Sequence, residues 1–92
     1  MSLSSRILLK GVESAMGTSS ANGSNFGNAT LVRIINTHAY DQVVTLTETV
    51  GGSTIAQFTL MAFENIELEK KPLNGIFAAS SAVKGVAIGY TN

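Results

Sequence analysis

The chain has 92 residues, a net charge of zero and charged side chains at 13% of its positions, about half the usual share of about 25%. This length fits one domain, and a neutral chain has no electrostatic field to attract nucleic acid or an anionic membrane as its main partner. Because the sequence contains no cysteine, disulfides and thiolate metal sites are excluded. A sparsely charged surface does little to keep copies apart, so we expect permanent assembly, most simply as a homo-oligomer.

Residues 1–29 are expected to form an extended N-terminal arm. The segment 6–10 has an apolar run, Ile7-Leu-Leu9, that is too short for a secretory signal or a membrane span, and it is expected to form a first strand or part of the arm. Residues 14–29 are uncharged and of low complexity, rich in Gly, Ser, Asn, Thr and Ala. Such a segment buries too little apolar surface to offset the entropy of ordering it. Two interpretations stay open, a disordered linker or an arm that becomes ordered on a neighbouring subunit.

A few large apolar side chains stand along this arm as isolated anchors. We expect them to make inter-subunit contacts; they are Ile7, Leu8, Leu9, Met16 and Phe26. Residues 6–12 are expected to add a strand either to a neighbouring sheet or to the open edge of their own sheet.

From Gln42 to Thr91, apolar and polar residues alternate with a period near two, which is typical of half-buried strands. Turn residues such as Gly51 and Gly52 separate the alternating runs. The expected strands cover residues 30–36, 42–50, 53–60, 63–69, 76–79 and 83–90. Residues 30–92 are therefore predicted to be an all-β domain, an antiparallel β-sandwich of jelly-roll or Ig-like type with about six to eight short strands.

The alternation also predicts which side chains face the interior. Thr45 and Thr47 are expected on the solvent face, and Gly85 and Gly89 are expected to mark a bulge or a close approach of the backbone. The expected interior residues are Val44, Leu46, Phe58, Leu60, Ile66, Leu68, Val86 and Ile88.

No group of residues has the pattern that chemistry requires. His38 and Asp41 are the only residues of their types, but they share one turn, where such side chains commonly bond local backbone. Glu64, Glu67 and Glu69 form the one carboxylate cluster, which we interpret as a charged face neutralised by the nearby lysines Lys70, Lys71 and Lys84. We expect no catalytic residue, no cofactor and no metal site.

Residues 30–92 resemble small β-sandwich virion proteins of tailed bacteriophages, including marine ones. The resemblance lies in a strand that ends in Asn36-Thr37 before Val43-Val-Thr-Leu-Thr47, and in Glu67-Leu-Glu-Lys-Lys-Pro72 followed by Ile76-Phe-Ala-Ala-Ser80. This chain has Phe63-Glu-Asn65 where that family often has Gly-Glu, and residues 1–29 have no counterpart.

The resemblance implies a structural component of a capsid, neck or tail. We expect a non-enzymatic capsid decoration subunit, located in the virion and assembled in the host cytoplasm. Its partners are expected to be other copies of itself or a major capsid, neck or tail protein, without nucleic acid or membrane. The alternatives are a neck or tail protein, or a ring-forming β-protein that binds a small ligand or RNA.

Overall fold

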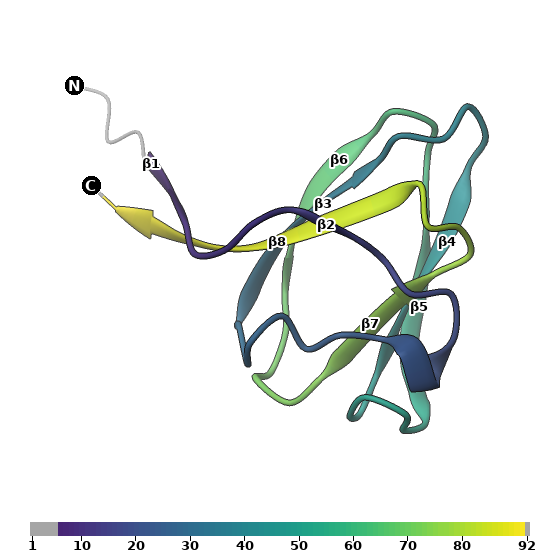
Figure 1. The fold of residues 1–92 in the computed structure, drawn as a ribbon, viewed down its shortest axis with the longest axis horizontal. Coiled ribbons are helices and arrows are strands. Elements are labelled where there is room, and N and C mark those ends of the chain that lie inside the picture. Colours follow the sequence, from purple (N-terminus) through teal and green to yellow (C-terminus); the bar gives the residue numbers. More distant parts are fainter. Residues whose placement is uncertain (1–5, 92) are drawn as a thin grey trace.

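Residues 6–91, the part of the chain that the computed structural model describes, form eight strands and one turn of 3-10 helix (Figure 1). In chain order these are β1 Arg6–Leu9, β2 Ser14–Ala15, η1 Ser20–Asn22, β3 Leu31–Asn36, β4 Gln42–Thr47, β5 Thr54–Leu60, β6 Asn65–Glu69, β7 Gly75–Ala78 and β8 Val83–Thr91. Each named pair of strands is antiparallel. The prediction of an all-β fold built from antiparallel strands is confirmed.

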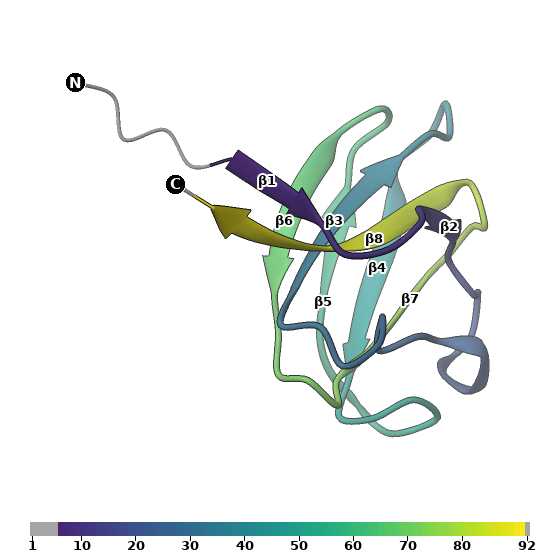
Figure 2. The same ribbon diagram turned by 60° about the vertical axis from the view of Figure 1, so that its left-hand side comes forward.

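The strands form two sheets that face each other (Figure 2). The five-stranded sheet has the order β1-β8-β3-β6, with β2 also paired to β8. The three-stranded sheet has the order β5-β4-β7. Since β1 and β2 both pair with β8, they act as one edge strand that is interrupted at residues 10–13.

One apolar core lies between the sheets. Alternate residues of β3, namely Val32 and Ile34, point into it from the five-stranded sheet, as the period-two pattern requires. The other fully enclosed members are Met16, Val44, Leu60, Ile76, Ala78 and Val83. Of the expected interior residues, Val44 and Leu60 are buried here, and Leu46, Phe58, Ile66 and Leu68 are half-buried against this cluster.

The expected positions of Val86 and Ile88 are wrong. In β8, Gly85 and Ala87 lie opposite Ile34 and Val32, so Val86 and Ile88 point to the other face of the five-stranded sheet. They are nevertheless buried there, with 4% and 2% of their surface exposed. Of the large apolar residues that β8 buries, Val83 belongs to the core, whereas Val86 and Ile88 are buried on the other side of the sheet.

The expected exposure of Thr45 and Thr47 is also wrong, since both are buried. The Thr45 hydroxyl accepts a hydrogen bond from Gln57 (3.3 Å). The Thr47 hydroxyl donates to the backbone oxygen of Thr49 at 2.7 Å, and Gly75 O lies at 3.3 Å. Hydroxyls bonded in this way can be covered at little cost.

The N-terminal segment does not stand apart from the domain, and the chain has no structural boundary at residue 30. β1 and β2 belong to the five-stranded sheet, and the main chain around η1 bonds the three-stranded sheet: Ala78 N donates to Gly17 O at 3.0 Å. Gly51 N also donates to Ser20 O at 2.9 Å. Residues 6–29 are thus part of the fold, whereas residues 1–5 of the expected arm lie outside the described residues.

Candidate assembly surface

The five anchors expected to contact other subunits fall into two groups. Ile7, Leu8 and Leu9 lie in β1, and all three side chains are exposed. β1 and the end of β8 form a two-stranded ribbon that extends away from the rest of the molecule (Figures 1 and 2). Of the two alternatives for residues 6–12, the structure has the second, because β1 pairs at the edge of its own sheet.

The ribbon continues an apolar surface on the outer side of the five-stranded sheet. Leu9 lies opposite Ile88 and Ile7 lies opposite Tyr90, so these side chains share the face that Val86 occupies. Ile7, Leu9 and Tyr90 are 46%, 66% and 47% exposed. We name this surface the outer apolar face and define it by Ile7, Leu9, Leu31, Val86, Ile88 and Tyr90.

Charged residues border the outer apolar face on the side of β6. Arg33 and Glu67 lie opposite each other in β3 and β6 and point to the same outer side. A side-chain hydrogen bond with Glu67 raises the pKa of Tyr90, and burial and the negative charge of Glu67 add to the shift. Since Glu67 interacts with Tyr90, one of the predicted carboxylates belongs to this surface.

Met16 and Phe26, the other two expected contacts, are used inside the chain itself. Met16 is 4% exposed and belongs to the core, and Phe26 packs against it. A Cβ added to Gly85 would lie 2.8 Å from Phe26 Cζ and 2.9 Å from Met16 Cε. The glycine in β8 therefore makes the space into which both side chains fit, and Met16 is buried inside its own chain.

An unusual turn holds Phe26 in this position. Phe26, Gly27 and Asn28 have φ values of 54°, 67° and 61°, a run of left-handed residues that costs Phe26 about 1–2 kcal/mol. Asn25 compensates, because its Oδ1 accepts hydrogen bonds from Gly27 N (3.1 Å) and Asn28 N (3.3 Å). The low-complexity composition thus supplies the residues that such a turn needs.

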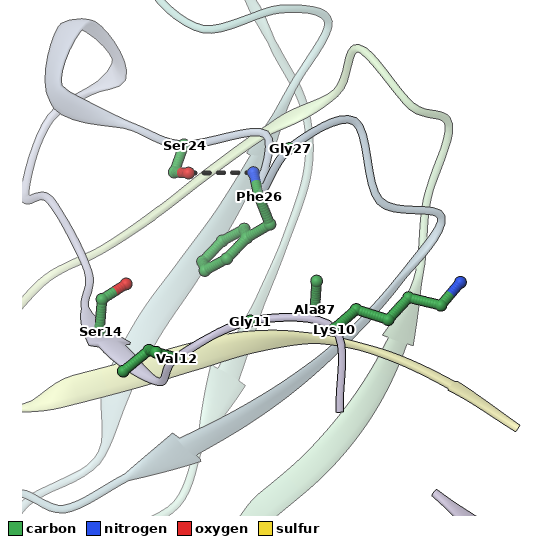
Figure 3. A pocket seen from close by; sticks show the side chains of 8 residues that line it. All are labelled: Lys10, Gly11, Val12, Ser14, Ser24, Phe26, Gly27 and Ala87. Atoms are coloured by element: carbon green, nitrogen blue, oxygen red, sulfur yellow. Dashed lines mark hydrogen bonds between the residues drawn. The ribbon is translucent and has the colours of Figure 1, made fainter. Parts of the chain in front are cut away.

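A cavity of about 280 Å³ lies beside Phe26, between residues 10–14, residues 24–27 and Ala87 (Figure 3). The Ser24 hydroxyl already accepts a hydrogen bond from Phe26 N at 3.0 Å. The Lys10 side chain extends away from the aromatic ring (Figure 3), and it lies over Gly89, where an added Cβ would be 2.9 Å from Lys10 Cε. The polar groups around the cavity therefore do not converge on a point where a ligand would sit.

His38, Asp41 and Glu64 each accept a hydrogen bond from a backbone N–H group. His38 Nδ1 accepts a hydrogen bond from Tyr40 N at 3.0 Å, and Asp41 Oδ1 accepts one from Ala62 N at 3.1 Å. Glu64 Oε1 accepts one from Met61 N at 2.8 Å. Within residues 6–91, no three His, Cys, Asp or Glu side chains are grouped so that they could hold a metal ion. The same residues include no helix that is both long and apolar enough to cross a bilayer.

Lys70 does not neutralise the carboxylate cluster in the way that the sequence led us to expect. Its side chain is buried and its ammonium group donates to the carbonyls of Ala29 (2.6 Å), Lys71 (3.2 Å) and Pro72 (3.2 Å). Burial lowers the pKa of Lys70. This lysine instead ties the end of the N-terminal segment to the turn that follows β6.

Sequence reasoning missed the outer apolar face as a unit. Val86 and Ile88 alternate with the small residues Gly85, Ala87 and Gly89, and this pattern was the available signal. In β8 the small residues Gly85 and Ala87 face the interior, where Met16 and Phe26 pack over Gly85. Comparisons of the chain with protein-family models, with curated proteins and with solved structures found no match.

Proposed function

We propose that this chain is a non-enzymatic structural subunit of a virus particle, a decoration protein of a tailed-phage capsid that binds through its outer apolar face. The proposal includes a closer description of the fold as a jelly-roll β-sandwich. It rests on the order of the strands, on the exposed apolar surface and on the resemblance of residues 30–92 to phage virion proteins.

The strand pairings support a jelly roll because they are nested. β1 pairs with β8, Ser24 bridges to Ile76 in β7, β3 pairs with β6, and β4 pairs with β5. If β1 with β2 counts as the first segment and the bridge at Ser24 as the second, the chain has eight segments, which pair first with eighth, second with seventh, third with sixth and fourth with fifth. This is the pairing of one long antiparallel hairpin that is rolled into two sheets. Jelly rolls occur in viral capsid domains, and also in lectins and cupins, so the function has to be argued from the surface.

The observation that carries the proposal is the exposed part of the outer apolar face. Ile7, Leu9 and Tyr90 are each about half-exposed or more, and they adjoin one another on a ribbon that leaves the body of the molecule. Contiguous apolar patches on a small domain mark surfaces that bind other proteins. A ribbon that carries such a patch outward can reach across the seam between two neighbouring subunits of a shell.

The charge balance agrees with this use. A chain with six basic and six acidic residues has no net charge that would repel further copies from a crowded lattice. Each contact through so small a patch is weak, but contacts linked within one particle strengthen one another.

Two changes test this surface, one on it and one beside it. Leu9→Ser places a hydroxyl on the outer apolar face, whereas Val12→Ser alters a side chain that is 91% exposed in the loop after β1. We expect Leu9→Ser to abolish co-sedimentation of the chain with capsids of the phage that encodes it, and Val12→Ser to leave it unchanged. Equal binding of both variants to capsids would contradict the proposal that the chain binds through its outer apolar face.

The class of function is tested by gene order and by particle fractions. We expect the gene to lie beside those for a major capsid or portal protein, and the chain to bind purified capsids and not purified tails. A gene among metabolic genes would contradict the virion proposal, and binding to tails alone would move the subunit to the neck or tail.

A further inference from the structure

The four edges of the two sheets are protected in different ways. The outer edge of β7 is covered by the chain's own backbone, since Ser24 N donates to Ile76 O at 3.1 Å and Ile76 N donates to Ser24 O at 2.9 Å. β6 carries Glu67 and Glu69 and is followed by two lysines and a proline. β1 is bounded by Arg6 and Lys10. Charges, proline and covering segments are the usual means by which proteins keep sheet edges from pairing.

β5 carries no charge and no proline, and its one bulge, at Ile55, leaves Ala56–Leu60 regular. It pairs only with β4 among the described strands, so its other edge presents unpaired backbone groups. No residue from 49 to 63 is charged, and Thr54–Leu60 contains neither proline nor glycine. Most of its side chains are exposed. Short, uncharged segments of this kind are the ones that pair most readily with another strand.

We propose that β5 is an interface and that its occupant is β5 of a second copy, which pairs antiparallel so that the three-stranded sheets of two molecules form one six-stranded sheet. A second copy fits because antiparallel pairing of one strand with itself is two-fold symmetric and uses the same residues on both sides. The strand carries no charge, so no register brings like charges together, and the neutral chain adds no long-range repulsion.

The irregularity in β5 predicts the register. In the pairing with β4, Leu46 lies opposite Ala56 but Thr47 lies opposite Thr54, so Ile55 is an extra residue without a partner in β4. The regular part of β5 is therefore Ala56–Leu60. The midpoint of that stretch is Phe58. A two-fold axis there places Phe58 against Phe58 of the partner subunit and Gln57 against Thr59 of the partner subunit. Phe58 is half-buried against the core, so this pairing extends the apolar interior across the interface.

The first experiment measures dimerisation in a chain whose outer apolar face is already altered by Leu9→Ser. Sedimentation equilibrium of this chain should show a dimer, and adding Thr59→Lys should raise its dissociation constant by about tenfold or more, because a lysine on an edge opposes pairing. Asn65→Lys on the exposed edge of β6 is the matched control and should leave the constant unchanged. A Leu9→Ser chain that stays monomeric at every concentration, or a dimer indifferent to Thr59→Lys, would overturn the proposal.

The second experiment tests the pairing itself and does not depend on the proposed function. Because the chain has no cysteine, single Gln57→Cys and Thr59→Cys variants each carry one thiol. Under mild oxidation a mixture of the two should form a disulfide-linked dimer far faster than either variant alone, since only unlike positions face each other. Equal rates in the mixture and in the separate variants would refute this register and orientation, even if the outer apolar face binds capsids as proposed.

Discussion

Two parts of the N-terminal segment have opposite compositions and opposite positions. β1 is the most apolar stretch before residue 30, yet Ile7, Leu8 and Leu9 are exposed on the ribbon. Residues 14–28 are mostly Gly, Ser, Asn and Ala, yet they place Met16 in the core and Phe26 against it. Average hydrophobicity along the segment would therefore predict that β1 is buried and residues 14–28 are exposed, which is the opposite of the observed arrangement.

The difference shows that burial depends on the surface that receives a side chain. Gly85 leaves space in β8 for Met16 and Phe26, and the turn at residues 25–28 aims the aromatic ring into that space. β1 continues past the end of β3, so no strand of the opposite sheet faces it (Figure 1). The same chain segment thus places Met16 and Phe26 at the core and exposes Ile7, Leu8 and Leu9.

The largest expected effect on stability is at Phe26. Phe26→Ala should lower the free energy of unfolding by about 3 kcal/mol, because it empties a half-buried aromatic site. Denaturant unfolding followed by circular dichroism measures this loss.

A glycine at the same position sharpens the test. Phe26→Gly removes one more carbon but accepts the positive φ of 54°, so it should be more stable than Phe26→Ala by about 1 kcal/mol. If the alanine variant is the more stable of the two, the left-handed turn is not present in solution.

The next largest effect on stability is at Gly85, over which Phe26 and Met16 pack. Gly85→Ala should cost about 1–3 kcal/mol, because its Cβ would meet Phe26 and Met16 at less than their contact distances. In a chain that already carries Met16→Ala the cost should be smaller, and a double-mutant cycle measures that coupling. Additive effects would mean that these side chains do not share the space above Gly85.

On the ribbon, Leu9→Ser should change the free energy of unfolding by no more than about 0.5 kcal/mol, since the side chain is two-thirds exposed. The same denaturant titration measures it beside Phe26→Ala. A loss as large as that of Phe26→Ala would place Leu9 in the folded core and erase the contrast between the two regions.

The smallest effect concerns Lys70, which holds the end of residues 14–29 through Ala29 O. Because burial lowers the pKa of Lys70 in the folded state, the unfolded chain binds the extra proton in the alkaline range between the two pKa values. Stability should therefore gain a small increment as pH rises through the lowered pKa toward the ordinary value of about 10.4. Thermal melting of the chain and of Lys70→Met should show this increment in the first and not in the second.

The strands could be predicted from the sequence because alternation is local. The runs around Val44 and Ile66 and the turn at Gly51 and Gly52 each carry their own signal within a few residues. The fit of Phe26 and Met16 to Gly85 could not be predicted, because it joins positions about sixty residues apart and depends on how the sheets close. The face of Val86 and Ile88 was assigned wrongly for a related reason, since these two large residues lie outside the core, whereas their small neighbours Gly85 and Ala87 face it.

The candidate surface was predicted in part. Ile7 and Leu9 were among the residues predicted to contact other subunits, but Ile88 and Tyr90 join them only through the pairing of β1 with β8. The free edge of β5 is likewise a property of strand order, which a single sequence does not specify.

The measurement that tests the central claim most directly compares the thermal unfolding of two truncated chains. One lacks residues 1–10, which include β1, and the other lacks residues 1–29, which also include Met16 and Phe26. The account predicts that the first melts cooperatively near the temperature of the full chain but no longer binds its partner, and that the second has no cooperative transition. A chain without residues 1–29 that melts like the full chain would contradict the claim that this polar segment is part of the fold.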